Sequence, residues 1–176
     1  ATLYESEKKL GNLMFTPELM DALEIDIQTL HKDAMISDLN YEPVLFTTED
    51  LIEAFALKKP LFAINLFNRK VRMRGDKLPM LTLTKGNQMN GASLILHKSI
   101  RKKIGDIVGG NFYVLPSSIH EVMIIPEEGF EAGELSKLVS TCNSQLYTEA
   151  NSKDILSDKV QWCSMDGEIL RRAENE

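Results

Sequence analysis

The chain has 176 residues, of which 43% are hydrophobic and 26% charged. This composition excludes a disordered chain, a collagen-like fibre and a disulfide scaffold, and the length fits one domain with at most a small appendage. The net charge of −6 argues against a dedicated nucleic-acid binder, and no apolar run approaches the ~18–20 residues that cross a bilayer.

The first segment, residues 1–57, is predicted to hold a strand and two helices. Residues 1–5 favour a short strand. Thr16-Pro17-Glu18 is typical of a helix start, with a hydroxyl cap and a proline in the first helical position. Apolar residues then recur at spacings of three and four, which predicts one helix running to about Met35.

The next elements are predicted from caps and breaks. Residues 37–46 are expected to be a loop containing Pro43. Thr47 or Thr48 is expected to cap a helix through Ala56, with its apolar face formed by Leu51, Ile52 and Phe55. Residues 58–77 are interpreted as a basic connecting segment that fits either a strand or a helix.

Residues 78–172 are predicted to form an α+β domain, a mainly antiparallel sheet built from hairpins with amphipathic helices packed on it. The middle hairpin is apolar on both faces, so we expect it to lie centrally in the sheet. Together with the N-terminal elements, this domain is expected to form one compact unit. The expected strands are 80–84, 92–96, 111–115, 119–125, 160–163 and 168–171, and the expected helices are 98–108 and 134–146.

The two helices of this domain have predicted inner and outer faces. In the first, Ile100, Ile104, Ile107 and Val108 are expected to face inward and Arg101, Lys102 and Lys103 outward. In the second, the inward positions are expected to be Leu135, Leu138, Val139 and Cys142.

Charge is strongly segregated along the chain. Residues 1–57 hold three Lys and twelve Asp/Glu, a net −9; residues 58–103 hold twelve Lys/Arg and one Asp, a net +11; residues 104–176 hold five Lys/Arg and thirteen Asp/Glu, a net −8. Either acidic groups cover the basic middle, or the middle binds an anion or a partner. The candidate residues for such binding are Arg69, Arg72, Arg74, Arg101, Lys102 and Lys103.

One polar cluster, Ser117, Ser118, His120 and Glu121, resembles hydrolase chemistry, in which a histidine base activates a serine nucleophile. In a strand, however, His120 and Glu121 would point to opposite faces, and Ser118 and His120 would stand ~6.6 Å apart. The alternative is structural, with the serines bonding backbone groups in a turn and His120 beginning a strand.

No metal or cofactor is predicted. His31, His97 and His120 are isolated in the sequence and lack metal-ligand spacing. Cys142 and Cys163 are expected to be free, partly buried thiols in a reducing cytoplasm, with a single disulfide left open as the alternative.

Several short strings resemble a known family. They are Leu81-Thr82-Leu83-Thr84, Met89-Asn90-Gly91-Ala92, the run from Phe112 to Val122 and Leu156-Ser157-Asp158. Together they are similar to an uncharacterised domain-of-unknown-function family of bacterial proteins found mainly in anaerobic gut Gram-positive species. The likeness covers roughly the last hundred residues and implies that the chain is the C-terminal portion of a longer protein.

The function predicted from these observations is a non-enzymatic interaction or regulatory module of the bacterial cytoplasm. Its partner would be another protein or the remainder of a longer chain, with homo-oligomerisation left open. One alternative is a hydrolase that uses His120 with Ser117 or Ser118. A second alternative is anion or nucleic-acid binding through the basic block.

Overall fold

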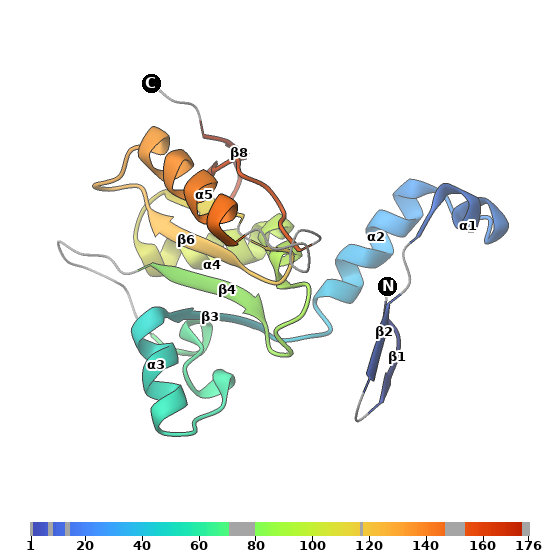
Figure 1. Ribbon diagram of the computed structural model, residues 1–176, viewed down its shortest axis with the longest axis horizontal. Coiled ribbons are helices and arrows are strands. Elements are labelled where there is room, and N and C mark those ends of the chain that lie inside the picture. Colours follow the sequence, from blue (N-terminus) through green and yellow to red (C-terminus); the bar gives the residue numbers. More distant parts are fainter. Residues whose placement is uncertain are drawn as a thin grey trace. The chain divides into compact units, whose positions relative to one another are not determined.

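The computed structural model describes residues 2–6, 9–12, 15–70, 80–116, 118–146 and 154–173 (Figure 1). The chain divides into two compact units, residues 1–40 and residues 41–176. None of the helices within the described ranges combines the length and the apolar character that a bilayer crossing requires.

The first unit contains a two-stranded ribbon and two helices. Strand β1 (Thr2–Ser6) pairs antiparallel with β2 (Lys9–Asn12). Helices α1 (Pro17–Ala22) and α2 (Ile27–Asp38) follow. As predicted, Thr16 caps α1, its hydroxyl accepting the backbone N–H of Leu19.

The prediction of a single helix to Met35 was wrong, because two local signals interrupt it. Glu24 adopts a left-handed conformation (φ 54°), and the N–H groups of Glu24 and Ile25 donate to Asp21 and Met20, which closes α1. Asp26 then starts α2 by accepting the N–H of Thr29 at 2.8 Å. The spacing of apolar residues continues across this break, so periodicity alone does not reveal it.

The second unit is an α+β fold built on a six-stranded antiparallel sheet with strand order β3-β4-β6-β5-β7-β8. The predicted middle hairpin, β5–β6, occupies the centre of this sheet, as expected. The strands are β3 (Pro43–Thr47), β4 (Leu81–Lys85), β5 (Phe112–Leu115), β6 (Val122–Pro126), β7 (Gln161–Cys163) and β8 (Leu170–Arg172).

Helices cover both faces of the sheet (Figure 1). On one face, α4 (Lys98–Val108) and the 3-10 helix η3 (Gly91–Leu96) pack on a cluster that includes Leu83, Val114 and Ile124. On the other face, α5 (Ala132–Leu146) packs on Tyr113, Leu115 and Ile125. The alternation of side chains along each strand therefore supplies two apolar layers.

Helix α3 (Thr48–Ala56) covers the end of the sheet at β3. Thr47 caps it, as predicted, by accepting the N–H of Asp50 at 2.9 Å. Its buried residue is Ala54, which packs with Val44 and Phe46 of β3. The prediction that Ile52 and Phe55 face inward was wrong, because they are 65% and 79% exposed. On α5 the predicted inward positions Leu138 and Cys142 are likewise exposed.

Three predicted boundaries also differ. Residues 43–47 form the edge strand β3 rather than a loop. Pro43 is tolerated there because, at the first position of an edge strand, its missing N–H removes no hydrogen bond to the neighbouring strand. Residues 91–96 form a 3-10 helix rather than a returning strand. Strand β6 begins at Val122 rather than at 119, because residues 118–121 form a loop that bonds other segments.

Two glycines allow α4 to approach the turn of the β7–β8 hairpin. A Cβ on Gly105 would overlap the backbone carbonyl of Met165, and one on Gly167 would lie 2.6 Å from the backbone nitrogen of Lys102. Gly167 also adopts a positive φ of 72°, as a turn glycine does. The hairpin is thus held against α4 by backbone-to-backbone contact.

We predict that Gly105→Ala lowers the free energy of unfolding by about 1–3 kcal/mol, because the new methyl group forces α4 and the hairpin turn apart. Urea denaturation followed by circular dichroism measures this loss. The matched control is Gly110→Ala, where no atom lies within 4 Å of the added Cβ, and it should be neutral or mildly stabilising. Equal effects of the two substitutions would contradict the close contact.

Candidate functional site

The polar cluster near residue 120 lies in the loop between β5 and β6. The Ser118 hydroxyl donates to the Glu121 carboxylate at 2.7 Å, and its oxygen accepts the N–H groups of His120 and Glu121 at 3.0 and 3.3 Å. These are the bonds of a serine turn. Ser117 lies outside the described residues.

His120 joins this loop to the segment that follows β4. Its Nδ1 accepts the backbone N–H of Asn90 at 3.2 Å, so the neutral ring carries its proton on Nε2. Its carbonyl accepts from Gly91 N–H and the Thr84 hydroxyl, both at 2.9 Å. A Cβ on Gly91 would lie 2.6 Å from that same carbonyl oxygen, so glycine is required there.

The structure therefore brings Ser118 and Glu121 together but gives His120 a different partner. The serine hydroxyl hydrogen bonds to a carboxylate, whereas a triad requires it to bond the imidazole. His120 and Glu121 lie before the strand rather than in it, which corrects the predicted start of β6. Two of the strings that carried the family resemblance, 89–92 and the run from Phe112 to Val122, contact each other through residues 90–92 and 119–120.

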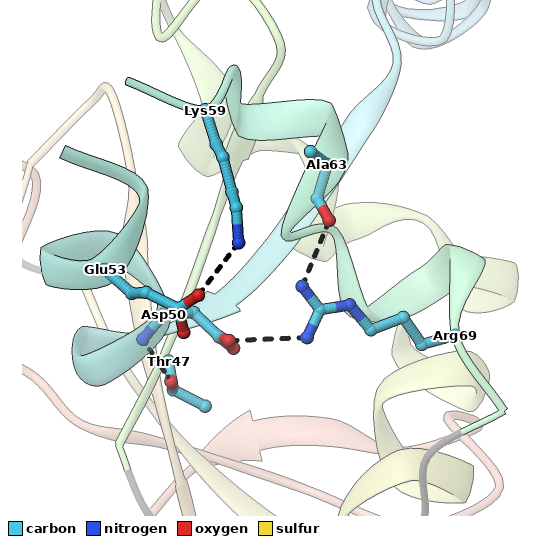
Figure 2. Close-up of polar contacts among 6 residues, drawn as sticks. All are labelled: Thr47, Asp50, Glu53, Lys59, Ala63 and Arg69. Atoms are coloured by element: carbon cyan, nitrogen blue, oxygen red, sulfur yellow. Dashed lines mark hydrogen bonds and ion pairs between the residues drawn. The ribbon is translucent and has the colours of Figure 1, made fainter. Parts of the chain in front are cut away.

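Arg69, the first of the predicted basic residues, joins α3 to the turns that follow it (Figure 2). Its guanidinium contacts Asp50 Oδ1 at 3.3 Å and donates to the Ala63 carbonyl at 3.1 Å. Lys59 pairs with Glu53 in the same region at 2.8 Å. Acidic groups of the first segment thus contact the basic middle at these positions.

The other predicted cations that the structure describes lie on α4. Lys102 pairs with Asp106 one helical turn later at 3.2 Å. Lys103 lies over the ring of Phe67, in the 3-10 helix η2 (Leu66–Asn68), at 5.9 Å from the centroid. Arg72 and Arg74 lie outside the described residues.

Arg101 is buried, with 8% exposure, so the prediction that it faces outward was wrong. Its Nε donates to the Gly167 carbonyl at 2.9 Å, and Nη1 donates to the carbonyls of Ile95 and Leu96 at 3.0 and 2.7 Å. Ile95 and Leu96 end η3, where backbone carbonyls lack helical partners. Arg101 is therefore the residue that joins η3, α4 and the β7–β8 turn.

Both cysteines are free: Cys163 is buried and Cys142 exposed. Burial raises the pKa of the Cys163 thiol to about 11, against the opposing effect of the nearby Arg101 guanidinium. Among the described residues, no group of three His, Cys, Asp or Glu side chains is placed to hold a metal ion.

A groove that sequence reasoning missed lies between α5 and the β7–β8 hairpin. Its main pocket has a volume of about 750 Å³, within the range typical of ligand sites. A smaller pocket of about 190 Å³ adjoins it at Ala173 and continues along α5 to Ser140. The main pocket is lined by Tyr113, Glu127, Gly129, Phe130, Glu131, Ala132, Gly133, Glu134, Lys137, Trp162, Arg171 and Ala173.

The sheet holds the aromatic wall of the groove in place. Tyr113 of β5 is the register partner of Trp162 of β7, which in turn faces Arg171 of β8. The Arg171 guanidinium lies over the indole at 4.9 Å from its centroid. The Trp162 Nε1–H donates to Glu127 at 2.7 Å, which fixes the orientation of the ring.

Further hydrogen bonds hold Glu127 in place. The second oxygen of Glu127 accepts from the Asn111 amide at 2.8 Å, and Asn111 Oδ1 accepts the Met165 N–H at 3.0 Å. The signal that could have indicated this site is the register of the final hairpin, which makes Trp162 and Arg171 cross-strand partners.

We predict that Arg101→Met lowers the free energy of unfolding by about 2–4 kcal/mol, because three backbone carbonyls, two of them in buried contacts, lose their donor. Lys102→Met, the matched exposed neighbour, removes one surface ion pair and should cost about 0.3–0.5 kcal/mol. Urea denaturation compares the two. Similar losses for both would contradict the structural role of Arg101.

We predict that the two thiols react at very different rates. In native protein, a disulfide reagent such as dithionitrobenzoate should titrate one thiol quickly, because Cys142 is exposed and thiolate is the reacting form. Cys163, whose pKa is raised to about 11, should react only on unfolding or at strongly alkaline pH. Cys142→Ser should abolish the fast phase; a fast phase that survives would show that Cys163 is accessible.

Comparison with known proteins gives a family and no activity. The model of the family of unknown function DUF5688 matches residues 1–163. No curated protein and no solved structure shows a significant match. Since that match covers most of the chain, including the groove's strands β5 and β7, the chain belongs to the DUF5688 family.

Proposed function

We propose that the chain is a binding module whose site is the groove between α5 and the β7–β8 hairpin, and that it captures an extended peptide segment of a partner protein. The observation that carries this proposal is the indole of Trp162, held by Glu127 on its N–H and by Arg171 over its ring. Aromatic and arginine side chains fixed in this way are the residues that most often dominate interface energies.

The dimensions of the groove favour a peptide over a small cofactor. Its pockets follow α5 from Ala132 to Ser140, eight helical steps or about 12 Å, which matches about four residues of extended chain. The lining of the main pocket combines aromatic rings, two cations and carboxylates, a mixture suited to a peptide with both apolar and charged side chains.

The polar cluster supports a binding role rather than hydrolysis. The Ser118 hydroxyl and the His120 imidazole both bond groups that stabilise the 118–121 loop. The exposed free thiol of Cys142 supports a cytoplasmic location, since such thiols persist in reducing compartments. The family resemblance further supports a bacterial source and a longer parent protein, whose remainder is then one candidate partner.

The test is selection from a displayed library of ten-residue peptides that lack tryptophan. Trp162 is the only tryptophan of the chain, so its fluorescence reports directly on the groove. We predict that enriched peptides change this emission with saturable binding. Arg171→Ala should weaken binding about tenfold, about 1.4 kcal/mol, because it removes a cation from the wall of the groove.

The matched control is Leu138→Ala, since Leu138 is a half-exposed residue of α5 that does not line the groove. It should bind the same peptides with unchanged affinity. Circular dichroism confirms that each variant is folded. A library that yields no peptide, or peptides that leave the Trp162 emission unchanged, would overturn the proposal.

A further inference from the structure

The two edge strands of the six-stranded sheet, β3 and β8, differ in whether their backbone groups are free to pair with another strand. At β3, the side chain of Asn65 takes the place of a neighbouring strand: its Oδ1 accepts the Leu45 N–H at 3.1 Å and its Nδ2 donates to the Pro43 carbonyl at 2.9 Å. Asn65 is 1% exposed. This edge is therefore closed against pairing with another chain.

The β8 edge has no such cover among the described residues, where β8 pairs only with β7. The Ala173 N–H donates to the Val160 carbonyl and the Ser164 N–H donates to the Ile169 carbonyl. In an antiparallel ladder these bonds alternate along the strand. Leu170 and Arg172 therefore direct their backbone N–H and C=O groups away from β7, toward the space beside the sheet.

The groove begins at this same edge. Arg171 stands between the two outward-directed residues, and its side chain lies over Trp162 in the groove. Its Nη1 donates to the Arg172 carbonyl at 3.3 Å, a long and exposed contact that an incoming N–H can replace. Within the described residues, neither arginine of β8 has an ion-pair partner.

We propose, building on the proposed function, that the partner peptide binds by adding a strand to β8 and carries an acidic residue opposite Arg171. Backbone groups of Leu170 and Arg172 supply the hydrogen bonds. The intervening peptide residue forms a non-hydrogen-bonded pair with Arg171, and such pairs bring Cβ atoms to about 4.5–5.5 Å. Its carboxylate then meets the guanidinium in the groove.

The charge of the β8 edge supports an acidic partner residue at that edge rather than a basic one. Two of the three β8 residues are arginines, and Lys137 adds a cation to the groove wall. The carboxylate of Glu127 is already occupied by Trp162 and Asn111. Glu131, just before α5, and Glu134, in its first turn, also line the main pocket, so the acidic peptide residue is proposed only for the position beside Arg171.

The experiment is an N-methyl scan of a peptide selected on the wild-type groove, with Trp162 emission as the readout. Strand addition predicts that the effect of N-methylation alternates along the peptide. Methylation of the two peptide residues that face Leu170 and Arg172 weakens binding at least about tenfold, whereas methylation of the residue between them has no effect. Arg171→Glu should weaken binding by a similar factor, and changing the acidic peptide residue to lysine should restore it.

The outcomes separate the two proposals. Binding that tolerates every N-methyl group, or a charge reversal that the lysine peptide does not rescue, would overturn strand addition while leaving groove binding intact. Failure to obtain any groove-binding peptide would overturn both. Sedimentation showing a dimer that Arg171→Glu dissociates would assign the edge to a second copy of the chain and overturn the peptide proposal.

Discussion

The buried guanidinium of Arg101 is the interaction on which the C-terminal part of the sheet depends. It joins carbonyls at the end of η3 to the carbonyl of Gly167, which lies 66 residues after Arg101 in the chain. A buried charge is costly unless its donors are bonded, and here three carbonyls share that role. The contact also holds Gly105 against the backbone of Met165 and Gly167 against that of Lys102, which positions the last hairpin on α4.

The position of the β7–β8 hairpin determines the shape of the groove on the sheet face that α5 covers. The hairpin carries Cys163 and Leu170 toward α4, and Trp162 and Arg171 toward α5. A core contact on one side of the sheet therefore sets the spacing between indole, guanidinium and helix on the other. The bonds from Trp162 through Glu127 and Asn111 to Met165 reinforce this coupling, because Met165 belongs to the same turn that packs on Gly105.

Local signals in the sequence predicted the parts of the fold that local chemistry decides. The caps at Thr16 and Thr47, the end of α4 at Gly109 and the central hairpin follow from side-chain hydroxyls, backbone conformation and apolar runs. The predictions were wrong where contacts with residues far along the chain determine the local structure. Residues 91–96 curl into η3 because Gly91 bonds the carbonyl of His120, and a sequence pattern does not show that partner.

For the candidate sites, too, local features were predictable and features that depend on distant residues were not. The turn chemistry of Ser118 was predictable from its residue type, since serine commonly bonds nearby backbone groups. The burial of Arg101 was not predictable, because a charged residue in a basic run is usually solvated and its three acceptors come from other segments. The groove was missed for a similar reason: its wall joins β5, β7, β8 and α5, which are separated in the sequence.

The closed β3 edge has a consequence for assembly. If copies of this protein ever pair through their sheets, Asn65 restricts the contact to β8 against β8. Such a contact uses the same surface on both molecules and has two-fold symmetry, so within the described residues it leaves no open edge of the six-stranded sheet for a third copy. Pairing of the six-stranded sheets would then stop at one continuous twelve-stranded dimer.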